Sequence, residues 1–338
     1  MLPFISHVSL IRYLVVWRVN SSLVQLPRCP SAELSHMLGT TIANRLPTQV
    51  ARGWRRALDA WGDATGDTLQ NRPSNEPIPE TAWPIEAVLF VYPGKQTYGQ
   101  GEVILWELKL MGAGADHGLF LEFILPAMEE AATTTDPQWQ RAKSLWGRFD
   151  IQAVYVARGP HWEPLVSTGR LDLNYRASAT QWAEGLTLGR NERRRFRRIR
   201  WITPFDLGEI PDAPPGDPPS HPQDSIPASE VPTFQTILDA LVSRMTMFLP
   251  GKHQAPEDVW ALVDPKEQTA LWLALQEADA ATQPHPELKP ASRYWPGRWI
   301  GIQTFGVIPQ RILPYLELAS ILHIGKQTHF GCGTFRLD

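Results

Sequence analysis

The sequence predicts an α+β fold of two tandem ferredoxin-like (βαββαβ) domains, and three observations support this. The chain has 338 residues, a length typical of two domains. Hydrophobic residues make up 43% and charged residues 20%, which is enough to form buried cores and excludes a wholly disordered chain. In each half, segments of alternating and helical apolar spacing follow the order strand, helix, strand, strand, helix, strand.

The first half carries this order with few interruptions and predicts a domain over residues 1–175. Apolar residues alternate over 7–19, which predicts the first strand. A helical apolar face follows over 31–46, with Ser31 as its N-cap. The remaining segments are a strand pair at 87–93 and 102–112, an apolar helix at 119–132 and a fourth strand at 148–158.

The second half repeats the order less cleanly, because of an insertion and an additional helical stretch, and predicts a domain over residues 190–338. It contains a Pro-rich insertion at 206–232, where the many prolines exclude a helix interior or a central strand and predict a loop. A periodic apolar face predicts a helix over 234–248. The other segments are strands at 198–205, 297–309 and 330–337, a helix at 310–321 and an additional helix at 267–280.

The cysteines and the N-terminus argue against several protein classes. Cys29 and Cys332 lie far apart with no zinc-ligand spacing, which favours neither a metal site nor a disulfide framework. A reduced, cytoplasmic protein without a cofactor is expected. Arg12 and Arg18 interrupt the apolar run 9–19, so we expect neither a signal peptide nor a membrane span there.

A glycine-rich segment lies between the last predicted helix and the last predicted strand. Glycines allow a loop backbone to approach a ligand closely and to donate N–H groups to phosphate, and a lysine adds one cation. The residues concerned are Gly325, Lys326, Thr328, Gly331 and Gly333. The segment precedes a strand, so it is neither a Walker A loop nor a dinucleotide fingerprint, and an ordinary glycine turn stays the alternative.

This segment resembles the C-terminal signature of the CRISPR-associated repeat-processing endoribonucleases of the RAMP superfamily. The matching residues are His323-Ile324-Gly325-Lys326, Thr328, Phe330-Gly331 and Gly333. The sequence departs at His323, where many members carry another glycine, so the loop is expected to be stiffer at its start. Residues 105–131 and 146–156 look like the middle region of the family, and 30–46 is similar to its first helix.

The resemblance implies two ferredoxin-like domains that bind the repeat stem-loop of precursor CRISPR RNA and cut it without a metal. In that reaction the 2′-OH before the cut attacks the adjacent phosphorus, which requires a general base, a general acid and a cation. Three histidines compete for the acid and base roles: His36, on the first predicted helix where the family usually places its catalytic histidine, His323 and His329. Each could instead be structural or bond the RNA backbone. Lys326 is the candidate phosphate contact, or a solvated loop lysine.

A dense arginine run before the Pro-rich insertion predicts an RNA-binding surface. Its members are Arg190, Arg193, Arg194, Arg195, Arg197, Arg198 and Arg200. Arginine forks suit RNA phosphates, and Phe196 or Trp201 could stack a base. The formal net charge of −3 conceals this run because the insertion is acidic. A solubilising basic loop is the alternative. A second basic patch is predicted at Arg45, Arg52, Arg55 and Arg56, unless these line an ordinary exposed helix face.

Two other function classes stay open. A non-catalytic RAMP subunit would hold processed guide RNA in a multi-subunit CRISPR effector complex without cutting it. A metal-dependent nuclease or phosphatase would need a carboxylate cluster. The acidic residues Asp59, Asp63, Glu129 and Glu130 are typical of solvated helix or turn positions instead.

Overall fold

The computed structural model describes residues 5–65, 83–134, 145–189, 195–208, 230–248, 255–280, 287–292 and 295–338. The chain forms two compact units. The N-terminal unit contains residues 9–186 together with 329–331, and the C-terminal unit contains 187–328 and 332–338 together with residues up to Val8. Most of the predicted loop 206–232 lies outside the described residues. The domain boundaries predicted at residues 175 and 190 stay a prediction.

The N-terminal unit is built on an antiparallel sheet with the order β3-β5-β1-β6, which β7 and β8 extend at one edge. Its strands are β1 (Leu10–Val19), β3 (Ala87–Val91), β5 (Val103–Met111), β6 (Phe149–Arg158), β7 (His161–Ser167) and β8 (Arg170–Leu171). Two short strands, β2 (Leu23–Gln25) and β4 (Thr97–Gly99), pair separately. In chain order the four central strands lie second, third, first, fourth, which is the ferredoxin-like arrangement.

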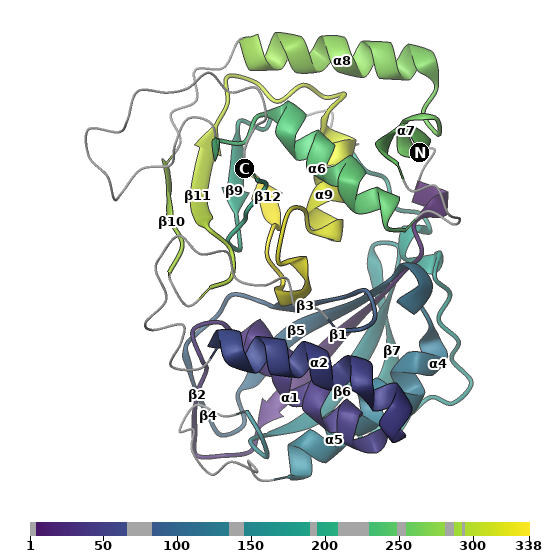
Figure 1. Cartoon of the computed structure of the whole chain (residues 1–338), viewed down its shortest axis with the longest axis vertical. Coiled ribbons are helices and arrows are strands. Elements are labelled where there is room, and N and C mark those ends of the chain that lie inside the picture. The colour runs from purple at the N-terminus through teal and green to yellow at the C-terminus, as the bar shows by residue number, and fades with distance from the viewer. Residues whose placement is uncertain are drawn as a thin grey trace. The chain divides into compact units, whose positions relative to one another are not determined.

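Helices cover one face of this sheet (Figure 1). They are α1 (Pro30–Arg45), α2 (Thr48–Thr65), α4 (His117–Leu119), α5 (Leu125–Thr133) and the π-helical turn Phe120–Ile124. The core between the layers is aromatic: Trp17 stacks on Phe149 with ring centroids 3.6 Å apart, and Tyr13 stacks on Phe120 at 3.8 Å. Tyr13 and Trp17 lie with Val15 on alternate positions of β1, as the predicted strand pattern requires.

The helix predicted over residues 119–132 is not continuous, because a π-helical turn separates α4 from α5. Pro126, in the first turn of α5, has no backbone N–H, so the α-helical bond from residue 126 to residue 122 cannot form. A wider turn at this point accommodates the proline ring. Single π turns of this kind are missed by apolar spacing, which changes little across them.

The C-terminal unit carries a second antiparallel sheet in the order β10-β11-β9-β12. Its strands are β9 (Arg198–Trp201), β10 (Glu287–Pro290), β11 (Trp299–Thr304) and β12 (Phe335–Leu337), and its helices are α6 (Phe234–Thr246), α7 (Pro256–Trp260), α8 (Pro265–Ala280) and α9 (Leu313–Leu322). The strand order is again second, third, first, fourth. The predicted α+β class with antiparallel sheets is therefore confirmed.

The described residues also include short 3₁₀ turns at Ile5–His7, Gly112–Gly114, Gln181–Ala183 and Thr328–Phe330. The strands β2, β4, β7, β8 and β10 and the helix α7 were not predicted. All of these except β7 are short, and β10 ends at a proline. Helix α8 corresponds to the additional helix predicted at 267–280. Within the described ranges, the chain has no helix of the length and apolarity that crossing a membrane requires.

Candidate functional site

Helix α1 carries His36, the first of the predicted catalytic histidines. The helix begins with Pro30 in its first turn and buries the face that contains Leu34, Met37 and Leu38 against the sheet. His36 lies beside that face and is only partly buried. Its neighbour Ser35 is buried, so the helix holds His36 at the margin of the core with part of the side chain accessible to a ligand.

His329 is buried in the same unit, and both of its ring nitrogens have hydrogen-bond partners. Nδ1 lies 2.8 Å from the carbonyl oxygen of Ala87, and Nε2 lies 2.7 Å from Oγ of Ser35. A carbonyl oxygen only accepts, so Nδ1 must donate, and in the neutral ring Nε2 accepts from the Ser35 hydroxyl. The ring of Trp83 lies beside it, with centroids 5.3 Å apart. These contacts link the residue before His36 to the start of β3.

His323 is also buried and serves the C-terminal unit. It caps the end of α9 with φ 58° and ψ 130°, a region that favours glycine. Its Nδ1 donates to the carbonyl oxygen of Cys332 at 3.1 Å. The positive φ explains why glycine suits this position in the resembled family. In this chain, His323 adopts the positive φ itself, and its ring makes a hydrogen bond across the loop.

The three predicted loop glycines lie against the protein's own backbone. All have positive φ, and a Cβ atom would lie 2.4 Å from the Asp206 carbonyl oxygen at Gly325, 2.7 Å from that of Leu89 at Gly331, and 1.8 Å from that of Ile324 at Gly333. The amides of Lys326 and Gly333 donate to the carbonyl oxygens of Asp206 and Pro204, both at 2.9 Å. These two N–H groups therefore serve the fold.

The side chains of Lys326 and Thr328 differ in exposure. Lys326 is exposed, whereas Thr328 is buried at the start of the last 3₁₀ turn. Both belong to the C-terminal unit. Lys326 thus has the accessibility that a phosphate contact requires, and its backbone is fixed through the hydrogen bond to Asp206.

The described part of the arginine run lies at and before β9. Arg195, Arg197 and Arg198 are exposed and Arg200 is half-buried, whereas Ile199 and Trp201 are buried. Alternate residues of a strand point to opposite faces, so Arg198 and Arg200 share the face opposite the core. The predicted members Arg190, Arg193 and Arg194 lie outside the described residues.

A further arginine, which was not among the predicted RNA contacts, extends this face onto β12. Arg336 pairs with Arg200 across the strands, and both form ion pairs with Asp338, at 3.0 and 2.7 Å. The hydrogen bond from Arg200, together with the charges of Arg336 and Arg198, lowers the pKa of the Asp338 carboxyl. The sequence shows Arg336 as a basic residue of the last predicted strand. Its proximity to Arg200, however, depends on strand pairing between positions 136 residues apart.

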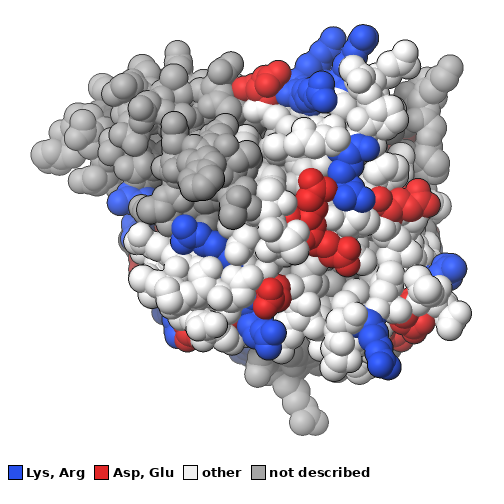
Figure 2. Space-filling model, turned by 90° about the horizontal axis from the view of Figure 1, so that it is seen from below, with Lys and Arg blue, Asp and Glu red and all other residues white. Residues whose placement is uncertain are grey.

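The second predicted basic patch contains one paired arginine and three exposed ones. Arg45 forms an ion pair with Glu130 at 2.9 Å, whereas Arg52, Arg55 and Arg56 are exposed along α2. On the face of the molecule in Figure 2, Lys and Arg side chains lie interspersed with Asp and Glu. Interspersed charges of both signs attract a phosphate backbone less than a run of one sign.

A buried polar cluster of Tyr13, His117 and Tyr175 in the N-terminal unit was not predicted from the sequence. Nδ1 of His117 lies 2.9 Å from the hydroxyl of Tyr13, and the Tyr175 ring packs edge-on against His117 with centroids 6.1 Å apart. Burial lowers the pKa of His117, and burial raises that of Tyr13. The only available signal was the position of His117 in a glycine-rich turn directly after a strand.

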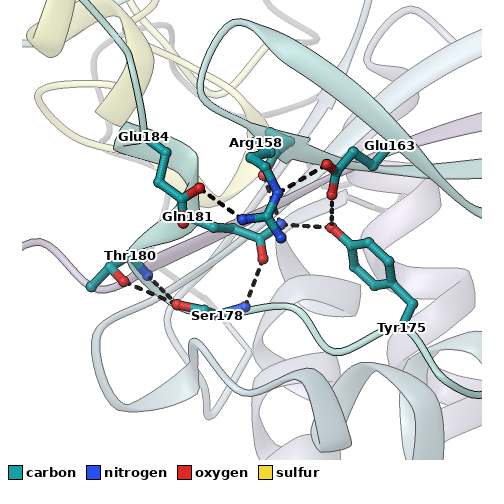
Figure 3. Close-up of polar contacts among 8 residues, drawn as sticks. Arg158, Glu163, Tyr175, Ser178, Thr180, Gln181 and Glu184 are labelled. Carbon is teal, nitrogen blue, oxygen red and sulfur yellow. Dashed lines mark hydrogen bonds and ion pairs between the residues drawn. The ribbon is translucent and has the colours of Figure 1, made fainter.

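This cluster continues into a surface network at the edge of the sheet (Figure 3). Tyr175 donates to Glu163 at 2.7 Å and accepts from Gln181 at 2.8 Å, and Arg158 bridges Glu163 and Glu184 at 2.9 and 2.7 Å. Gly159 has φ 54°, and a Cβ there would lie 1.7 Å from the Glu184 carbonyl oxygen. The network therefore fastens the segment after β8 to β6 and β7.

The described residues contain no group of three or more His, Cys, Asp or Glu side chains arranged to hold a metal ion. Cys29 and Cys332 are both buried thiols, and burial raises the pKa of Cys29 to about 12. This places them with the core residues and not with the candidate site.

Residues 220–335 match the family model of the CRISPR-associated endoribonuclease Cas6. The match includes the glycine-rich segment and confirms the resemblance predicted from it. Among curated protein sequences, none matches the chain.

Several solved structures are similar at low identity. A chain described as "Partial Cas6-RT-Cas1--Cas2 complex" is 13% identical with a TM-score of 0.45, and the match covers 97% of this chain and 46% of that one. A second, described as "Cas6-RT-Cas1--Cas2 complex", has the same identity and TM-score, with 28% of its chain covered. A Cas6 product complex is 13% identical with a TM-score of 0.37, covering 98% and 99%. This chain thus spans less than half the length of the first two.

Proposed function

We propose that this chain, which matches the Cas6 family over residues 220–335, is an endoribonuclease that cuts the repeat stem-loop of precursor CRISPR RNA. The family match carries the proposal, because it covers the segment that the sequence alone singled out. The exposed arginines at and before β9 supply the positive surface that an RNA backbone requires. A larger CRISPR effector complex stays a predicted partner.

The proposed reaction is an internal transesterification without a metal. A general base removes the proton of the 2′-OH before the cut, O2′ forms a bond to phosphorus, and the bond from phosphorus to O5′ breaks. A general acid returns a proton to O5′, which leaves a 2′,3′-cyclic phosphate and a 5′-OH. The base gains one proton and the acid loses one, so atoms and charge balance. Lys326 stays the proposed phosphate contact of the C-terminal unit.

His36 is the proposed general base. Of the three candidate histidines it is the one with a partly accessible side chain, whereas His323 is 1% and His329 5% exposed. Each of the two buried histidines also uses Nδ1 to donate to a backbone carbonyl. A group that transfers a proton must reach the substrate. The accessible position therefore favours His36 over the two loop histidines.

A repeat RNA with a single 2′-deoxy nucleotide before the cut site tests the reaction. We expect purified protein to cut the all-ribose RNA in EDTA and to leave the deoxy RNA intact, because the attacking hydroxyl is missing. Cleavage that needs a divalent metal would support a metal-dependent nuclease instead. Tight binding without any cleavage of the ribose substrate would support the non-catalytic subunit.

His36→Ala tests the residue assignment. General acid–base catalysis contributes about 10²- to 10⁴-fold, so we expect single-turnover cleavage to slow by that factor while RNA affinity stays unchanged. The measurements are single-turnover rates and filter binding to the deoxy RNA. His161→Ala, on an exposed histidine of β7, is the control and should cut at the normal rate. A His36→Ala protein of normal rate would move the assignment to another residue.

A further inference from the structure

We propose that His329 and Ser35 position His36 for catalysis, so that the end of the glycine-rich segment acts on the reaction without touching substrate. The proposal rests on the proposed function of His36 as general base. All three residues belong to the N-terminal unit. It assigns to His329 a role different from the acid, base or RNA-contact roles that the sequence suggested.

The imidazole of His329 connects two elements of the fold. Nδ1 donates to the carbonyl oxygen of Ala87, the first residue of β3, at 2.8 Å, and Nε2 lies 2.7 Å from Oγ of Ser35 on α1. Because Nδ1 donates, Nε2 is the acceptor when the ring is neutral. Because the ring is rigid and 95% buried, it sets the distance between the start of β3 and this turn of α1.

Ser35 is held at its backbone as well as at its side chain. The indole Nε1 of Trp83 donates to the Ser35 carbonyl oxygen at 3.2 Å, and the ring of Trp83 packs on both His329 and Trp54. His36 follows Ser35 directly, and the direction of a helical side chain is set by its backbone. The orientation of His36 is therefore coupled to the contacts of Ser35.

Gly331 keeps the segment that carries His329 close to β3. Its φ is 75°, and a Cβ atom would lie 2.7 Å from the Leu89 carbonyl oxygen and 3.2 Å from Cα of Phe90. Any other residue would push this segment away from the strand. The glycine of the signature thus supports the position of His329 over Ala87 through a close backbone approach.

Catalysis is sensitive to the placement of a general base, since misplacement by about 1 Å can reduce a rate by about 100-fold. The Ser35–His329 hydrogen bond is a buried contact one residue from the proposed base. Its loss should change the rate of the chemical step and leave RNA binding intact. His329 itself is a positioning residue, because its two ring nitrogens are engaged with the protein.

Two substitutions break this hydrogen bond from opposite sides. Ser35→Ala removes the hydroxyl, and His329→Asn retains an amide donor near the Nδ1 position but loses the acceptor at Nε2. We expect each to slow single-turnover cleavage about tenfold, the equivalent of one hydrogen bond of about 1.4 kcal/mol, with an unchanged dissociation constant for 2′-deoxy RNA. The double variant should be no slower than either single variant.

Ser31→Ala is the matched control. Ser31 lies one turn earlier on α1, is similarly buried, and its Oγ accepts from the Val91 amide of β3 at 3.4 Å. It should cut at nearly the normal rate. If Ser31→Ala slows cleavage as much as Ser35→Ala, the effect is a general weakening of the fold and the proposal is wrong. It is also wrong if Ser35→Ala cuts normally.

The second test uses the His36→Ala background. If Ser35 acts through His36, adding Ser35→Ala to His36→Ala causes no further loss of rate. A further tenfold loss would overturn the proposal, because the hydroxyl would then act without His36.

Separate measurements distinguish failure of the proposed function from failure of the positioning role. A wild-type protein that binds but does not cut RNA contradicts the endoribonuclease, and NMR spectra of the histidine rings then decide the positioning role. We expect Ser35→Ala to shift the ring signals of both His329 and His36, and Ser31→Ala to shift neither. Unmoved His36 signals in Ser35→Ala would refute the coupling.

Discussion

The two sheets share one strand order but differ in how they hold their charged side chains. In the N-terminal unit, Glu107 and Lys109 on β5 are 2% and 3% exposed, and Glu107 accepts from Arg12 at 2.5 Å and from Tyr92 at 3.2 Å. In the C-terminal unit, Arg198 and Arg336 are exposed at the face opposite the core. The same topology therefore carries a buried ion pair in one unit and an accessible cationic face in the other.

The difference follows from the physics of burial. A buried charge must be paired, because burial removes its hydration. Burial alone would raise the pKa of Glu107, but the charges of Arg12 and Lys109 hold it below its ordinary value. The exposed arginines need no such partner, so they are able to bind an anionic ligand. Strand order alone therefore does not favour either unit as the proposed RNA surface, whereas the environment of the charges favours the C-terminal unit.

The largest expected effect comes from breaking the buried pair. Glu107→Ala leaves Arg12 and Lys109 without their shared carboxylate, and removing one partner of a buried pair costs about 3–5 kcal/mol. Urea denaturation should show this loss in the free energy of unfolding. The control is Asp150→Ala, which breaks the exposed pair with Arg18 at 3.6 Å and should cost less than about 1 kcal/mol. Equal losses would mean that burial does not distinguish the two pairs.

The accessible face is expected to affect RNA affinity instead of stability. Replacing Arg195, Arg197 and Arg198 by alanine should weaken binding and lower the slope of log K against log salt by about 2 to 3, since each phosphate contact contributes about 0.7–0.9. Binding titrations across salt concentrations measure the slope. Alanine at Arg52, Arg55 and Arg56 is the matched triple on α2. A larger slope change in that triple would place the RNA on α2.

The order of strands and helices was predictable from sequence because apolar spacing is a local property. Residues 7–19 and 148–158 alternate, and they form β1 and β6. The predicted ferredoxin-like order places these two strands side by side, but their register could not be predicted, since it depends on contacts between positions far apart in the chain. The π turn at Phe120–Ile124 was missed because it shifts the helical pattern by a single residue.

The site shows a similar limit. The positions of Gly325, Gly331 and Gly333 predicted a backbone that approaches a ligand closely, and in the structure each lies against a carbonyl oxygen of the protein itself. Glycine spacing identifies close approach and not what is approached. The partner of His329 is Ser35, 294 positions away, so its burial and tautomer could emerge only from the fold.

The smallest expected effect concerns pH and the buried cluster at His117. Tyr13, Asp116, Tyr175 and Arg176 surround this histidine, and burial lowers its pKa below the ordinary 6.5. The unfolded chain therefore binds a proton at His117 at a higher pH than the folded chain does. The free energy of unfolding should then be at its full value above about pH 6.5 and fall as the pH decreases toward the lowered pKa.

The slope contributed by a single group is at most about 1.4 kcal/mol per pH unit, so a difference measurement is required. His117→Asn removes the titrating ring, and we expect the stability of this variant to decline less than that of the wild type between pH 7 and pH 5. His161→Asn, an exposed histidine on β7, should retain the wild-type slope. If all three proteins lose stability in parallel, His117 takes up its proton equally in the folded and unfolded chains. Burial would then affect stability through the charge of Glu107 but not through the protonation of His117.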